Sequence, residues 1–208
     1  MSLIDSRHLA DDTDRMDSAG PARRQFLAAS IVSGVLLALT VIVLRLEGRQ
    51  WWCACQQFMV WAGDVKSSHC SQHLFDPYAF THVLHGVALC GVFALAFPRL
   101  PAVWSFVLTL AVEAVWEIVE NSSVVIDRYR TATAGLGYEG DTVVNAVGDI
   151  GACLAGWAVA RRLGWRWSIA VWLVVEIVLL FWIRDNLLLN VVMLLFPVDA
   201  LKQWQLGR

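Results

Sequence analysis

The chain has 208 residues, of which 58% are hydrophobic, and its mean hydropathy is +0.57. The apolar residues stand in long blocks, which is the composition of a membrane protein and leaves no room for a separate soluble domain. The formal net charge of -2 gives no basic surface and no base-reading motif is present, so nucleic acid is not an expected partner.

The N-terminal segment, residues 1–25, is polar and charged and shows no apolar period, so we predict a flexible tail there. Residues 26–208 are predicted to form a single all-α domain, a polytopic transmembrane helical bundle of five spans with a short sixth apolar segment. The first span runs from Phe26 to Leu44, close to the roughly 20 residues that cross a bilayer.

The loop after the first span carries Cys53-Ala-Cys55, followed by His69, Cys70 and His73. On an oxidising side of the membrane, Cys70 is expected to form a disulfide with one of the two earlier cysteines. A metal site made of cysteines and histidines is the alternative, which ranks second because the C-x-C spacing is short for the usual zinc geometry.

The second and third spans are predicted at residues 78–97 and 102–120, joined by a very short turn into an antiparallel hairpin. Asp76 is placed as the N-cap of the second span and Pro77 as its first helical residue, a common way for a helix to begin. The segment 121–140 is predicted to be a polar loop.

The fourth span is predicted from Asp141, which would cap it, to about Ala160, and the fifth from about Trp167 to Ile183. The last apolar segment, Leu187–Phe196, is too short for an ordinary span and is predicted to be re-entrant, interfacial or a short sixth helix. The distribution of Lys and Arg over the short loops favours a cytoplasmic N-terminus.

Ionisable and amide side chains gather at one end of the predicted spans. They are His82 and His85 on the second span, Glu113, Glu117 and Glu120 on the third, Asp141, Asn145 and Asp149 on the fourth, and Arg184 after the fifth. Spacings of three and four place each set on one helical face. Because the antiparallel order brings these ends to the same side of the bundle, we expect the sets to meet.

Charged groups at membrane depth cost a few kcal/mol each, so they persist where they pair, face water or bind something. Imidazole, carboxylate and amide groups together suit a divalent cation such as Zn²⁺, Mn²⁺ or Mg²⁺. The predicted metal ligands are His82, His85, Glu117, Asp141, Asn145 and Asp149, and the predicted catalytic residues are Glu117 or Glu120, acting as a base, together with Arg184. The alternative is a polar network that only fixes helix packing.

The first hypothesis from these residues is a metal-binding membrane protein. Its possible activity is hydrolysis of a lipid or envelope substrate at the periplasmic interface. A transport protein for an ion or proton is the second hypothesis, although Glu176 is the main polar group further along the bundle. A structural or assembly factor is the third.

The chain from Ser71 onward resembles uncharacterised protein family 0314, also known as domain of unknown function 2585. The resemblance is carried by Ser71-Gln72-His73, Thr81-His82-Val83-Leu84-His85-Gly86, Trp116-Glu117-Ile118-Val119-Glu120-Asn121-Ser122-Ser123, Tyr138-Glu139-Gly140-Asp141-Thr142-Val143-Val144-Asn145, Ile183-Arg184-Asp185-Asn186 and Gln203-Trp204-Gln205. It implies a multi-pass protein of the bacterial inner membrane and no established activity. The order of His, Glu and Asp-x-x-x-Asn on successive helices is also similar to VanZ-like membrane proteins, which are linked to envelope antibiotic tolerance.

Overall fold

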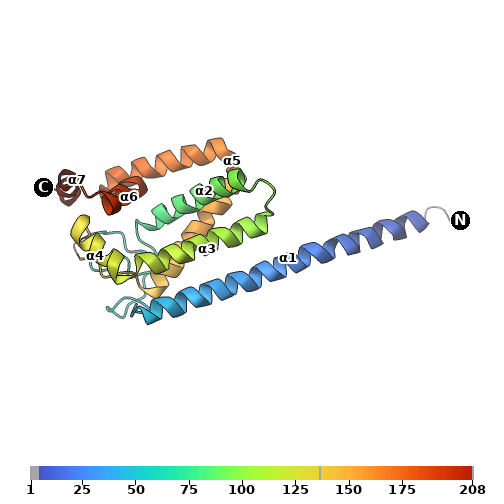
Figure 1. The fold of residues 1–208 in the computed structure, drawn as a ribbon, viewed down its shortest axis with the longest axis horizontal. Coiled ribbons are helices and arrows are strands. Elements are labelled where there is room, and N and C mark those ends of the chain that lie inside the picture. Colours follow the sequence, from blue (N-terminus) through green and yellow to red (C-terminus); the bar gives the residue numbers. More distant parts are fainter. Residues whose placement is uncertain (1–4, 136, 208) are drawn as a thin grey trace.

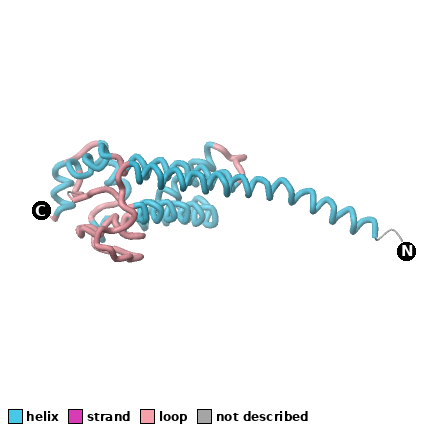
Figure 2. Tube along the Cα trace, turned by 90° about the horizontal axis from the view of Figure 1, so that it is seen from below, coloured by secondary structure: helices cyan, strands magenta, loops and turns pink. Residues whose placement is uncertain are grey.

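The protein is an all-helical bundle whose long loops gather at one end (Figures 1 and 2). The computed structural model describes residues 5–135 and 137–207. In chain order the helices of this part are α1 (Asp5–Leu46), α2 (Ala79–Ala96), α3 (Ala102–Glu120), α4 (Ser123–Ala132), α5 (Val143–Ile183), α6 (Leu187–Leu195) and α7 (Asp199–Leu206). The all-α class predicted from the sequence is confirmed.

Four helices, α1, α2, α3 and α5, are long and apolar enough to cross a membrane. The 41 residues of α5 are about twice the length that one crossing needs, and Gly164 interrupts the helix with φ 73° and ψ 171°. In Figure 1 the second half of α5 turns back along the bundle. The two halves of α5 are therefore the predicted fourth and fifth spans, and α6 is the short additional segment.

The outer faces of these helices are apolar and open. On α1, Val35 and Leu39 are exposed, and Val115 of α3 and Phe181 of α5 are exposed as well. A soluble protein rarely leaves such continuous apolar faces uncovered, whereas lipid would cover them. The exposed faces and the lengths of the helices agree with a protein embedded in a bilayer.

Helix α1 begins at Asp5, upstream of the start at Phe26 that the sequence predicted. Much of the segment expected to be a flexible tail is thus helical, and residues 1–4 of that tail lie outside the described part of the chain. The extension is not explained by helix propensity alone, because it includes Pro21, which lacks the N–H of a helical hydrogen bond.

The prediction of a polar loop over 121–140 was wrong for its first half, which contains α4. Ser122 caps this helix, its hydroxyl accepting a hydrogen bond from the Val125 N–H at 3.4 Å. Ile126 and Tyr129 are buried at a spacing of three. A search for long apolar blocks passes over a short amphipathic helix of this kind.

Two predicted helix starts are displaced by one or two residues. The N-cap of α5 is Thr142, whose hydroxyl accepts from the Asn145 N–H at 3.3 Å, so Asp141 does not cap the helix. The N-cap of α2 is Tyr78, and the Asp76 carboxylate accepts from the Tyr78 N–H at 2.7 Å. The displacement frees the Asp141 carboxylate for other partners.

Helix α2 packs against α5 with backbones in direct contact. A Cβ atom at Gly86 would lie 1.8 Å from the carbonyl oxygen of Cys153, and one at Gly156 would lie 2.0 Å from that of Val83. Only glycine permits this approach, because any side chain would overlap the opposite backbone. The close contact sets the distance between the polar side chains that the two helices carry.

Candidate functional site

The site begins with two histidines in the first turns of α2 that share one carboxylate. His82 Nδ1 lies 2.6 Å from Glu113 Oε1, and His85 Nδ1 lies 3.1 Å from each Glu113 oxygen. The spacing of three residues places both rings on the face of α2 that meets α3. His82 and Glu113 are buried, and His85 is half-buried.

Glu113 settles which nitrogen of His82 carries the hydrogen. An ionised carboxylate only accepts hydrogen bonds, so Nδ1 of His82 donates, and in the neutral form of the ring Nε2 keeps a free lone pair. That Nε2 lies 3.9 Å from Asp149 Oδ2 on α5. Glu113 thus orients His82 toward α5, a role that the sequence analysis did not assign to it.

Glu117 lies one turn further along α3 and is completely buried. Its Oε1 is 3.3 Å from His82 Nδ1, and within the described chain neither of its carboxylate oxygens has a hydrogen-bond partner. The same holds for Asp149 Oδ1 and for both polar atoms of the Asn145 amide. Buried polar atoms are nearly always paired in native structures, so this concentration of unpaired atoms makes the cluster a candidate binding site.

Candidate ligand atoms fall into three overlapping groups, with the atoms of each group within 4.8 Å of one another. The groups are His82, His85 and Glu113; His82, Glu117 and Asp149; and Glu117, Glu120 and Asp141. The structure therefore brings together side chains from the start of α2, the end of α3 and the start of α5, as the antiparallel order predicted. His82 and Glu117 each belong to two groups and so link the three groups together.

Asp141 is held in place by side chains that the sequence analysis did not single out. The Asn121 amide donates to Asp141 Oδ2 at 2.9 Å and accepts from the Asp141 N–H at 2.6 Å. The Tyr138 hydroxyl donates to Asp141 Oδ1 at 3.0 Å. Burial raises the pKa of Asp141 above its ordinary value, and the hydrogen bonds from Asn121 and Tyr138 offset part of that rise.

Glu120 has one oxygen engaged and one free. The Tyr129 hydroxyl of α4 lies 2.9 Å from Glu120 Oε1 and 3.0 Å from Asn190 Oδ1 of α6. In the described part of the chain, Glu120 Oε2 has no partner. Helices α4 and α6 therefore position Glu120, and their contribution could not be read from the sequence because α4 itself was not predicted.

The structure does not place Arg184 in this cluster. Arg184 is exposed at the C-terminus of α5, where its φ is 57°, and its guanidinium donates to the Trp204 carbonyl of α7 at 3.2 Å. A left-handed residue ends the helix and turns its side chain toward the C-terminal segment. The predicted catalytic role of Arg184 therefore has no support from the geometry.

The predicted disulfide is absent, since all five cysteines are free thiols in the described chain. Cys70 lies apart from the C-x-C pair, and its thiol donates to Asp76 Oδ2 at 3.5 Å. Burial, followed by the charge of Asp76, raises the pKa of the Cys70 thiol. Cys53 and Cys55 lie instead beside His69 and His73.

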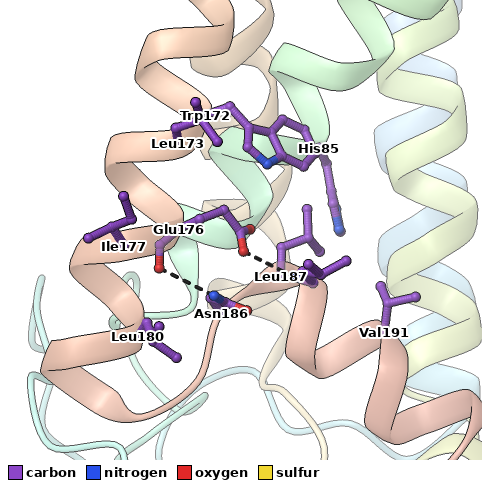
Figure 3. A pocket seen from close by; sticks show the side chains of 10 residues that line it. His85, Trp172, Leu173, Glu176, Ile177, Leu180, Asn186, Leu187 and Val191 are labelled. Atoms are coloured by element: carbon purple, nitrogen blue, oxygen red, sulfur yellow. Dashed lines mark hydrogen bonds between the residues drawn. The ribbon is translucent and has the colours of Figure 1, made fainter.

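An apolar pocket of about 460 Å³ adjoins the cluster between α2, the second half of α5 and α6. Figure 3 shows His85 and Trp172 at one end of this pocket and Glu176 near its middle. The Glu176 carbonyl accepts from the Asn186 side-chain amide at 3.3 Å, and its Oε2 accepts from the Leu188 N–H at 3.4 Å, whereas its Oε1 has no partner among the described residues. Among the residues that line the pocket, His85 also contacts Glu113 and so connects the pocket with the cluster.

Comparison with known proteins finds the family model described as "Protein of unknown function (DUF2585)" over residues 44–207. A UPF0314 protein of Rhizobium meliloti is 44% identical over 174 residues, which are 83% of this chain and 87% of the relative. UPF0314 proteins of Sphingopyxis alaskensis and Brucella anthropi are 40% and 39% identical, over 85% and 89% of this chain and 94% of each relative. No solved structure matches the chain significantly.

Proposed function

This chain belongs to the DUF2585 family, and we propose that it is a metal-dependent hydrolase that acts on a lipid or envelope substrate in the bacterial inner membrane. The observation that carries the proposal is Glu117, a completely buried carboxylate with no hydrogen-bond partner among the described residues. A cation nearby would keep this carboxylate ionised, because burial of an uncompensated charge costs several kcal/mol.

The proposed ligands of a divalent cation are His82, Glu117 and Asp149, with Asn145 one turn before Asp149 on the same face of α5. One imidazole and carboxylate or amide oxygens suit Zn²⁺ or Mn²⁺. Glu113 supports the set by holding the Nδ1–H of His82, as carboxylates commonly do behind metal-bound histidines. Asp141 and His85, also predicted as ligands, lie in the two adjoining groups.

A divalent cation held there would lower the pKa of a coordinated water toward neutrality and polarise a carbonyl or phosphoryl oxygen. Glu120 is the proposed base, because its Oε2 is unpaired while Tyr129 holds Oε1 at 2.9 Å. One fixed and one free oxygen allow the carboxylate to accept a proton without losing its position.

The pocket beside His85 favours a substrate with an apolar chain. Its lining is mostly aliphatic, with Leu173 and Ile177 from α5 and Leu187 and Val191 from α6. An acyl or isoprenoid chain in this pocket would bring the polar end of a lipid toward His85 and the buried carboxylates. Apolar walls with a few convergent polar groups are typical of ligand sites.

We place the site near the periplasmic face, with the N-terminus in the cytoplasm. The turn at residues 97–101 and the break at Gly164 lie at the opposite end of the bundle from the cluster, and they carry or adjoin Arg99, Arg161 and Arg162. Positive residues in short loops favour the cytoplasmic side. The looser likeness to VanZ-like proteins stays a prediction.

The test is elemental analysis of detergent-purified protein together with Glu117→Gln and Asp149→Asn variants. Wild type should carry about one divalent ion per chain more than either variant. Glu176→Gln is the matched control, a buried acid outside the cluster, and should leave the metal content unchanged. Equal metal content in all four proteins would overturn the proposal.

Activity is tested separately with a total lipid extract of the bacterial membrane and mass spectrometry of the products. Glu120→Gln should retain the metal and stop product formation, because only the proton acceptor is removed. An ion or proton transporter or a packing network would form no product with wild type. Absence of product with metal-loaded wild type therefore supports those two alternatives over the hydrolase.

A further inference from the structure

The loop between α1 and α2, residues 47–78, covers the N-terminal end of α5. The Val143 N–H donates to the Gln50 carbonyl at 2.8 Å, and the Val144 N–H donates to the Trp51 carbonyl at 3.1 Å. The Thr142 N–H donates to the Ser71 carbonyl at 3.0 Å. These bonds satisfy N–H groups that the first turn of a helix leaves unpaired, so the loop fixes the start of the helix that carries Asn145 and Asp149.

Four side chains of this loop converge, and they differ in kind from the buried carboxylates. Cys53 Sγ lies 3.5 Å from His69 Nδ1, Cys55 Sγ lies 4.0 Å from His73 Nε2, and the two imidazole nitrogens are 3.1 Å apart. All four atoms lie within 4.8 Å of one another. Cys53 and His73 are buried, and Cys55 and His69 are half-buried.

Two of the three distances are close to those of a tetrahedral zinc site, while the distance from Cys55 Sγ to His73 Nε2, 4.0 Å, is longer. Bonds of about 2.3 Å to sulfur and about 2.0 Å to nitrogen, at tetrahedral angles, imply about 3.5 Å between S and N and about 3.3 Å between two N atoms. The spacing of Cys53 and His69 equals the first of these, and the two histidines come close to the second. The short C-x-C spacing is accommodated by a turn in which the Cys55 N–H points at Cys53 Sγ at 3.3 Å, as backbone donors do toward thiolates.

A hydrogen bond between the two imidazoles would explain the short distance between the histidines. It would not explain why each of these nitrogens also lies beside a cysteine thiol. A disulfide bond between Cys53 and Cys55 would not explain why both histidines lie beside these two sulfur atoms. Two sulfur and two nitrogen donors in a tetrahedral arrangement are typical of zinc, whereas the deeper cluster offers mainly oxygen.

We propose that Cys53, Cys55, His69 and His73 bind a structural Zn²⁺ ion, separate from the cluster around Glu117. The ion would join the two ends of the loop, since the C-x-C pair and the two histidines stand 16 and 18 residues apart in the chain. A metal that closes a loop stabilises the fold and fixes the segment that borders α5. The proposal does not rest on the hydrolase hypothesis.

The test is zinc content in a Glu117→Gln background, so that any metal bound at the deeper cluster contributes as little as possible. The double substitution Cys53→Ser and Cys55→Ser should remove about one zinc ion per chain. Cys70→Ser is the matched control, because this thiol belongs to the same loop and bonds to Asp76 instead. Unchanged zinc in the double variant would overturn the proposal.

Measurements on the unmodified protein keep the test independent of whether the double variant folds. X-ray absorption at the zinc edge should show sulfur neighbours at about 2.3 Å together with lighter neighbours at about 2.0 Å. Cys53 and Cys55 should resist alkylation until a zinc chelator is added. Neighbours that are oxygen or nitrogen alone, or a Cys53–Cys55 disulfide in protein purified without reductant, would contradict the site. A negative result in these measurements would not bear on metal binding by the Glu117 cluster, so the two proposals are tested independently.

Discussion

Glu113 Oε1 accepts the Nδ1 hydrogen of His82 across 2.6 Å, and this bond turns His82 Nε2 toward Asp149. The carboxylate also raises the basicity of the ring. Glu113→Gln should therefore weaken binding of Zn²⁺ or Mn²⁺ by about 10-fold to 100-fold while leaving the number of sites unchanged. Competition with a chelator of known affinity measures this change, and equal affinity in variant and wild type would contradict the orienting role.

Gly156 should not tolerate a side chain, because the Val83 carbonyl would lie 2.0 Å from a new Cβ atom. Backbone cannot move aside as a flexible side chain can, so α2 and α5 would separate. We expect Gly156→Ala to lower the free energy of unfolding by about 1–3 kcal/mol or more. Gly151→Ala on the same helix is the control, since nothing lies within 4 Å of its Cβ position. A thermal melt in detergent compares the two, and similar midpoints would argue against close packing.

Asp185, between α5 and α6, gives a pH dependence of stability. Burial raises the pKa of Asp185 to about 6, although the Asn186 N–H and the Tyr78 hydroxyl offset part of the rise. The folded state therefore binds the proton more tightly than the unfolded state does. The resulting stability is fully present below the unfolded pKa and is lost as the pH rises through the folded pKa.

Asp185→Asn should consequently match wild type near pH 4 and exceed its stability near pH 7.5, by at most about 3 kcal/mol at about 1.4 kcal/mol per pKa unit. Unfolding midpoints at the two pH values test this difference. Asp199→Asn, at an exposed position at the start of α7, is the control and should show no such gain at the higher pH. A gain of equal size at both pH values would point to packing in place of ionisation.

Asn121 should be essential to the position of Asp141. Its amide makes two hydrogen bonds with Asp141, at 2.9 and 2.6 Å, and its Nδ2 also donates to the Glu117 carbonyl at 3.0 Å. Asn121→Ala would leave these buried groups unpaired, at a cost of about 1–3 kcal/mol in the free energy of unfolding. The exposed neighbour Ser123→Ala serves as the comparison, with a change within about 0.5 kcal/mol. Equal effects of the two substitutions would contradict this account.

The spans, and the end of the bundle at which their polar side chains meet, could be predicted from the sequence because the bilayer imposes both. Twenty apolar residues are needed for each crossing, and alternating directions bring the His82, Glu117 and Asp149 turns to one side of the bundle. The same reasoning missed α4, since its ten residues are amphipathic and carry no long apolar block. Tyr129 was therefore not connected with Glu120.

Other details depend on geometry that spacing does not contain. The left-handed conformation of Arg184 turns it away from the cluster. This conformation could not be predicted from the sequence, because arginine has no preference for it. The path of the long first loop decides which of its three thiols lie together, so the pairing of Cys70 was predicted wrongly. The role of Glu113 follows from one hydrogen bond, and the sequence shows only that it stands four residues before Glu117.

Gly164 joins the two halves of α5 through a single backbone conformation, φ 73° and ψ 171°, that is essentially confined to glycine. Each residue added to a helix rotates all that follow by about 100°. One insertion just after Gly164 would therefore swing Trp172 and Glu176 off the pocket wall while leaving His82 and Asp149 facing each other. The proposed metal site and the pocket proposed to hold the substrate thus depend on opposite halves of α5, so the shape of the pocket could change while the arrangement of the buried carboxylates is kept.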